Sequence, residues 1–139
     1  MEKRLARKHA NDTTSIWSDD NVEIMVNPTG DRDVYYHFIV NSAGTMTDIK
    51  HVAHMRRGGS DVAWNAGATA DVARLDDSWK VELSIPLAAL EGLRADRFPA
   101  EIVRQRKLKG GIAETYRWSP YSRSNLDIVN YGSFVRKGK

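Results

Sequence analysis

Residues 79–85 read Trp-Lys-Val-Glu-Leu-Ser-Ile, and this stretch decides the fold class. Apolar and polar side chains alternate strictly along it, which is the pattern of a β-strand with one buried face. The apolar face carries Trp79, Val81, Leu83 and Ile85. Because such a face is stable only when a second layer covers it, the stretch predicts a strand in a packed β-domain.

The segments that flank this strand predict a hairpin and one helical turn. Residues 68–75 form a second extended run, and the polar turn at residues 76–78, Asp-Asp-Ser, separates the two runs. Pro86 suits the first turn of a helix, and leucines recur at near-helical spacing over residues 87–93. We therefore expect one short helical turn that plugs one end of a sheet.

Further short strands precede and follow this hairpin. Turn formers end the first two of them, at residues 27–31 and 41–44. The predicted strands cover residues 21–26, 34–40, 45–49, 100–106, 115–118 and 130–135. Short strands with a single helical insert indicate an all-β fold, an antiparallel β-sandwich of immunoglobulin or jelly-roll type with one short helical turn.

The positive charge of the chain is concentrated at its two ends. The 139 residues carry 21 Lys and Arg against 18 Asp and Glu, which gives a net charge of +3. Both ends are basic, so the body between them is mildly acidic. We expect a basic N-terminal segment over residues 1–14, one β-sandwich domain over residues 15–135 and a basic tail over residues 136–139. This distribution favours no nucleic-acid partner.

Several classes of chemistry find no support in the sequence. No cysteine is present, which excludes disulfides, thiolate catalysis and cysteine-rich zinc sites. No stretch approaches the ~20 apolar residues that span a bilayer, so no membrane partner is expected. An enzyme would need a nucleophile with its base or two opposed carboxylates, whereas Asp19, Asp20 and Glu23 crowd one strand start. The sequence predicts a binding module without a catalytic centre.

Two tryptophans lie where loops are expected to gather. Trp17 precedes a strand within a polar segment, and Trp118 ends a strand. A pyranose ring stacks its C–H face on an indole while its hydroxyls need polar partners. Read alone, both residues also fit half-buried side chains that cap the sandwich. Trp79 is predicted to be plain core, and Trp64 to be a loop plug or partial core.

The order of short motifs along the chain resembles carbohydrate-binding module family 9 and its family 9-like, DOMON-like relatives. The motif W-x-D-D-x-V-E begins at Trp17, and W-x-x-E-hydrophobic-x-I-P begins at Trp79. R-x-R follows at Arg104, W-S-P at Trp118 and Y-G at Tyr131. The likeness covers residues 15–135, and its specificity lies in the ordered set. The resemblance implies a non-catalytic β-sandwich, often appended to xylanases and other glycoside hydrolases in an extracellular or periplasmic setting.

The resemblance also implies a site for a carbohydrate ligand. Trp17 and Trp118 match the two tryptophans that hold a sugar between them, Glu23 matches a carboxylate that accepts hydroxyl protons, and Arg104 matches an arginine that donates to sugar oxygens. Thr115 stands where sugar-binding members have an amide. Such a clamp requires two accessible indoles that face each other across roughly 7 to 8 Å, about two stacking distances.

Two further expectations follow from the family pattern. Some members hold structural calcium through carboxylates, for which the candidates are Asp19, Asp20, Asp31 and Asp33. Members also carry several strands upstream of the W-x-D-D motif, whereas this sequence starts shortly before it. An uncovered sheet edge is therefore expected, and with it a homo-oligomer. The alternative function is a structural or protein-interaction β-sandwich that has lost sugar binding.

Overall fold

The computed structural model describes residues 14–52, 59–94, 96–108, 113–125 and 127–137. These residues form nine strands: β1 (Asn21–Val26), β2 (Val34–Asn41), β3 (Met46–Val52), β4 (Gly59–Asp61), β5 (Thr69–Arg74), β6 (Trp79–Ser84), β7 (Arg97–Lys107), β8 (Ala113–Arg117) and β9 (Gly132–Val135). Three short 3-10 turns complete the described structure: η1 (Thr14–Ser18), η2 (Leu87–Ala89) and η3 (Ile128–Asn130). The predicted all-β class is confirmed.

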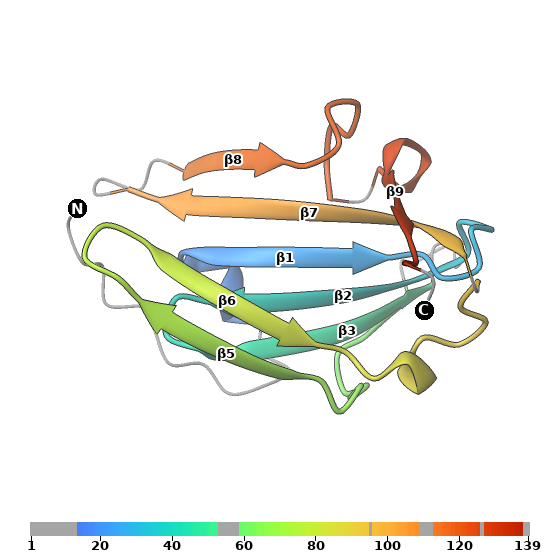
Figure 1. Ribbon diagram of the computed structural model, residues 1–139, viewed down its shortest axis with the longest axis horizontal. Coiled ribbons are helices and arrows are strands. Elements are labelled where there is room, and N and C mark those ends of the chain that lie inside the picture. The colour runs from blue at the N-terminus through green and yellow to red at the C-terminus, as the bar shows by residue number, and fades with distance from the viewer. Residues whose placement is uncertain (1–13, 53–58, 95, 109–112, 126, 138–139) are drawn as a thin grey trace.

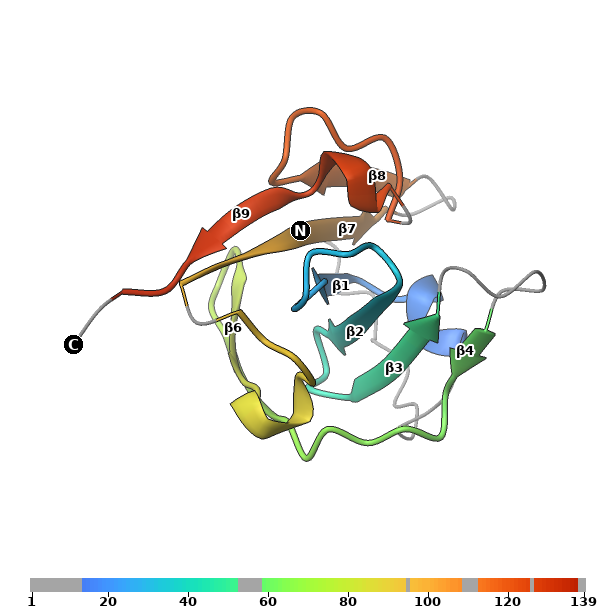
Figure 2. The same ribbon diagram turned by 90° about the vertical axis from the view of Figure 1, so that its right-hand side faces the viewer.

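The strands form two layers. One is a seven-stranded sheet in the order β4-β3-β2-β1-β7-β8, with β9 also paired to β7. The other is the β5–β6 hairpin, which lies in front of β1, β2 and β3 in Figure 1 and on the opposite side of the interior from them in Figure 2. All recorded strand pairs are antiparallel, so the structure confirms the predicted antiparallel sandwich.

Alternation along β1 defines two faces of the larger sheet. Ile24 and Val26 pack in the same core as Leu83 of β6, and we call this side the hairpin face. Glu23 and Met25 point the other way, to what we call the polar face. Both faces of β1 are largely buried, because the hairpin covers one and short turns and loops cover the other. Polar side chains of β1 are therefore inside the molecule.

Two tryptophans mark the limits of the main core. Trp64 packs on Tyr36 and Phe38, with ring centroids 4.7 and 6.0 Å apart, which confirms its prediction as partial core. Trp79 is only partly buried, and the guanidinium carbon of Arg104 lies 5.1 Å from its ring centroid. Trp79 is therefore not the plain core residue that was predicted, since a charged side chain covers it where the second sheet ends.

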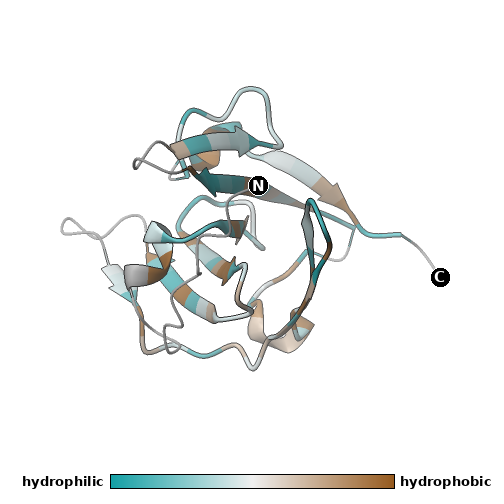
Figure 3. Cartoon of the chain, turned by 90° about the vertical axis from the view of Figure 1, so that its left-hand side faces the viewer, coloured by the Kyte–Doolittle hydropathy of each residue, from teal (hydrophilic) through white to brown (hydrophobic). Residues whose placement is uncertain are grey.

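The predicted helical turn is present as η2, which is apolar throughout (Figure 3). Two turns, η1 and η3, and one short strand, β4, were not predicted. β4 reads Gly-Ser-Asp, which has no strand pattern, and it is extended because it pairs with the edge of β3. The second sheet contains only β5 and β6, so within the described residues the outer edge of β6 has no partner strand.

Candidate functional site

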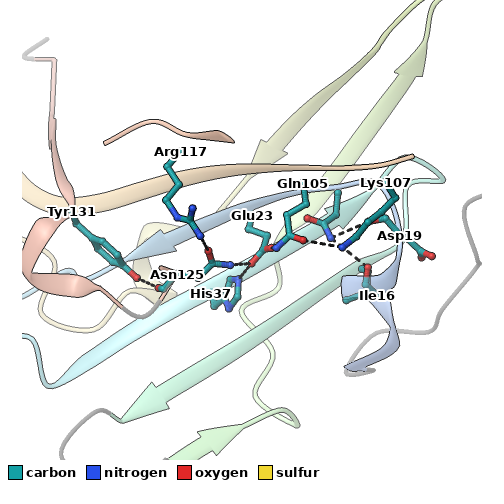
Figure 4. Close-up of polar contacts among 10 residues, drawn as sticks. Ile16, Asp19, Glu23, His37, Gln105, Lys107, Arg117, Asn125 and Tyr131 are labelled. Carbon is teal, nitrogen blue, oxygen red and sulfur yellow. Dashed lines mark hydrogen bonds and ion pairs between the residues drawn. The ribbon is translucent and has the colours of Figure 1, made fainter. Parts of the chain in front are cut away.

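Glu23 lies at the centre of a polar cluster on the polar face. Its side chain is fully buried, at 0% exposure. Oε2 lies 2.7 Å from His37 Nε2 and accepts a hydrogen bond of 2.7 Å from Asn125 Nδ2, while Oε1 accepts one of 2.7 Å from Gln105 Nε2 (Figure 4). A buried carboxylate is stable only with such partners. Glu23 therefore fixes the orientation of three neighbouring side chains.

Three strands and one loop bring these groups together. Glu23 lies on β1, His37 on β2 and Gln105 on β7, and the register of the central strands places all three on one face. Asn125 comes from the loop after β8, where its backbone carbonyl oxygen accepts a hydrogen bond from the Tyr131 hydroxyl. Burial raises the pKa of Tyr131, which keeps that hydroxyl protonated as a donor. The loop is thus tied to the sheet beside Glu23.

Partly exposed side chains form the rim of this Glu23 cluster. Lys107 Nζ donates to Gln105 Oε1 at 3.1 Å, and Arg117 Nη2 donates to Asn125 Oδ1 at 3.4 Å. Thr115 lies opposite Gln105 on β8 and is exposed. The cluster therefore runs outward from a buried carboxylate through two amides to two cations.

A row of aromatic rings borders the cluster. The ring centroids of Trp17 and His37 lie 6.1 Å apart, those of His37 and His51 5.5 Å, and those of His51 and Tyr35 4.5 Å. Burial, with a smaller contribution from His37, lowers the pKa of His51 to about 4, so this ring is neutral near neutral pH. Trp17 is half-buried and packs against Ile49 and other isoleucines, which holds its indole beside the polar groups.

Strand alternation separates the predicted site residues. Trp17, Glu23 and Thr115 lie on the polar face. Arg104 pairs with Val22, one position away from the partner of Glu23, and therefore points to the hairpin face. There it covers Trp79 and lies 3.8 Å from Asp20, and burial lowers its pKa. The structure does not bring Arg104 to Glu23.

Trp118 also belongs to the hairpin face. Its indole packs edge-on against Phe134, with ring centroids 5.3 Å apart. The indole also lies so close to Gly132 that a Cβ atom at that position would overlap it. Half of its surface is exposed, and it lines an apolar groove of about 490 Å³ together with Phe98 and Leu93. Trp17 packs on the other face. The predicted clamp of one sugar between these two indoles is therefore corrected, because the sheet lies between them.

Sequence reasoning missed the amides that surround Glu23. Gln105 is the central residue of the R-x-R motif, and its pairing opposite Asn21 on β1 would have identified it had the register been known. Asn125 lies in a loop where no local pattern marks it. His37 lies within the predicted strand at residues 34–40, and no motif of the sequence marks it.

The calcium candidates do not form one site. Asp19 accepts a hydrogen bond from Asn41, and Asp20 accepts the backbone N–H of Lys107, both near the start of β1. Asp31 and Asp33 lie in the turn after β1, where the N–H of Asp33 donates to Asp31 and lowers the pKa of Asp31.

Among the residues that the structure describes, no group of three or more His, Cys, Asp and Glu side chains could hold a metal ion. Nor does that part of the chain include a helix long and apolar enough to cross a membrane.

Comparison with known proteins bears on the fold. No protein-family model matches the chain, and no curated protein matches it. Among solved structures, the chain is similar to a candidate carbohydrate-binding protein from Bacteroides uniformis ATCC 8492, with a TM-score of 0.64 and 20% sequence identity. The match covers 89% of this chain and 63% of that one, so this chain spans less than two thirds of that protein. At this identity the likeness shows a shared β-sandwich fold.

Proposed function

We propose that this chain is a non-catalytic carbohydrate-binding domain that holds a sugar at the rim of the Glu23 cluster. The observation that carries the proposal is the buried carboxylate, which accepts three hydrogen bonds and so orients two partly exposed amides near a half-buried indole. The order of sequence motifs and the likeness to the candidate carbohydrate-binding protein from Bacteroides uniformis support the same ligand class.

The amides match the chemistry of sugar hydroxyls, which both donate and accept hydrogen bonds. Gln105 and Asn125 each use one amide N–H on Glu23, which leaves a second N–H on each side chain. Their carbonyl oxygens face Lys107 and Arg117, whose remaining N–H groups serve as further donors. Glu23 itself is enclosed, so its role is to position the amides and not to touch the sugar.

Trp17 supplies the apolar surface that a pyranose ring needs. Its indole lies beside His37, and its inner side is anchored by the isoleucine cluster of Ile16, Ile39 and Ile49. The C–H face of a sugar ring buries apolar area when it stacks on such an indole. In this proposal Trp17 stacks on the sugar without Trp118.

The carboxylates of the polar face suit binding better than hydrolysis. Glu23 and Glu101 are both buried, at 0% exposure, and Glu101 accepts the backbone N–H groups of Ile102 and Ser119. Glycoside hydrolysis needs two carboxyl groups that flank an accessible glycosidic bond. On the basis of the family resemblance, the proposal includes that this domain assists a glycoside hydrolase in polysaccharide breakdown.

A protein-interaction sandwich is the second candidate, because the apolar groove beside Trp118 lies on the opposite face from Glu23. Calorimetric titration with xylo- and cello-oligosaccharides separates the two functions. We expect Trp17→Ala and Gln105→Ala to lose sugar binding, and Trp118→Ala to keep it. Failure of every glycan to bind the folded protein refutes the carbohydrate proposal. If Trp118→Ala loses binding while Trp17→Ala and Gln105→Ala keep it, the location of the site at the Glu23 cluster is refuted.

A further inference from the structure

Two cations lie on the polar face at the ends of neighbouring strands. Lys107 ends β7 and Arg117 ends β8, and each side chain is partly buried. In the described part of the chain, neither forms an ion pair with Asp or Glu. By contrast, Arg104 and Arg106, on the hairpin face of β7, lie 3.8 and 3.4 Å from Asp20 and Glu114. Among these four cations, only the two on the polar face have no ion pair with a described carboxylate.

The two cations occupy equivalent places around Glu23. Each contacts the carbonyl oxygen of an amide, Gln105 or Asn125, whose N–H donates to the buried carboxylate (Figure 4). Arg117 Nε is also buried without a hydrogen-bond partner among the described residues. A charged donor that has only neutral partners retains most of its attraction for an anion.

The strand register sets the spacing of these cations. Lys107 pairs with Ala113, and Arg117 pairs with Val103, four residues back along β7. Four residues of a strand span roughly 13 Å. Gln105 pairs with the exposed Thr115 between them, so the cations flank a polar strip that is longer than one sugar ring.

In the described part of the chain, the carboxylates around the strip have hydrogen-bond partners of their own. Asp127, in the loop after β8, is partly exposed and accepts hydrogen bonds from the backbone of Arg123 and the side chain of Asn130. Glu23 and Glu101 are buried and hydrogen-bonded. Asp20 accepts the Lys107 backbone N–H and faces Arg104. The charge of a bound anion would therefore meet two cations and partnered, mostly buried acids.

We propose that the ligand of this face is an acidic glycan whose uronate carboxylates pair with Lys107 and Arg117. This inference rests on the proposed function and specifies its substrate class. A guanidinium matches a carboxylate with two parallel hydrogen bonds, and the lysine ammonium supplies a second charge at the other end of the strip. Trp17 and the amides contact the neutral parts of the sugar.

The test compares tri-galacturonic acid with its fully methyl-esterified form, which has the same backbone without charge. Calorimetric titration at low salt is expected to show about tenfold tighter binding of the acid, a preference that disappears near 1 M salt, where the screening length is about 3 Å. Lys107→Gln and Arg117→Gln each weaken binding of the acid more than binding of the ester, and so reduce this preference. Arg106→Gln, on the hairpin face of the same strand, is the matched control and keeps the preference.

The outcomes separate the two proposals. Equal affinity for acid and ester, or an unchanged preference in both variants, refutes the acidic ligand, and the carbohydrate proposal survives if Trp17→Ala still abolishes binding. If neither probe nor any neutral glycan binds the folded protein, both proposals fail. If Arg117→Gln binds neither the acid nor the ester, the substitution has displaced Asn125. The preference for the acid is then judged from Lys107→Gln, which leaves Asn125 in place.

Discussion

Replacing Glu23 by glutamine tests the central role of the buried carboxylate. The substitution keeps the shape of the side chain and removes its charge. A glutamine oxygen can still accept from His37 and Asn125, but its NH2 group then faces the NH2 group of Gln105, whose own carbonyl oxygen is held by Lys107. One charge-assisted hydrogen bond is lost, the other two weaken, and a buried donor is left without an acceptor.

The expected loss of stability is about 3 kcal/mol, since a hydrogen bond to a charged group contributes about 1.5–3 kcal/mol and removal of one buried charged partner costs about 3–5 kcal/mol. For a domain of this size that loss lowers the unfolding temperature by roughly 10 °C. Differential scanning calorimetry measures the change directly. Glu82→Gln is the matched control, because Glu82 is exposed beside Lys80 and its loss should change stability by no more than about 0.5 kcal/mol. An E23Q protein that melts within about 2 °C of the wild type would refute the reasoning.

Three other outcomes follow from the structure. Gly132→Ala should lower the midpoint of urea unfolding by the equivalent of about 1–3 kcal/mol, because its Cβ would overlap the Trp118 ring, and an unchanged midpoint contradicts that packing. Burial lowers the pKa of His51 to about 4, so between pH 6.5 and 4 the unfolded chain binds a proton there that the folded chain does not. The free energy of unfolding should therefore fall as the pH drops from about 6.5 toward 4. A flat wild-type profile, or the same slope in His51→Phe, contradicts this burial. The open edge of β6 predicts self-association in light scattering at high concentration, against which a clean monomer would count.

The fold was largely predictable because local alternation carries it. β6 begins at Trp79 as the alternating pattern predicts, and η2 begins one residue after Pro86. β4 was missed because its three residues are extended only through pairing with β3. The buried state of Glu23 was missed for a related reason, since β1 is covered on both faces and a polar side chain there is enclosed by other strands.

The Glu23 cluster was less predictable because it depends on the pairing register between strands that are far apart in the sequence. Gln105 and Glu23 are 82 residues apart, and a shift of one residue in the pairing of β1 with β7 would place Arg104 where Gln105 lies. The motif therefore located the strand that contacts Glu23 but pointed to the neighbour of the residue that makes the contact. Asn125 reaches the cluster from a loop, whose path no periodic pattern records.

The position of Glu23 beneath the surface has a consequence for how specificity evolves or is engineered. Because the carboxylate holds the amides from below, the outer residues Lys107, Thr115 and Arg117, which face the ligand in our proposal, can be substituted while Glu23 still anchors Gln105 and Asn125. Thr115 is the first position to substitute, since its side chain is exposed and lies opposite Gln105. If the proposed site is correct, the buried residues can stay constant while the surface residues vary, so that related sequences recognise different glycans with one interior.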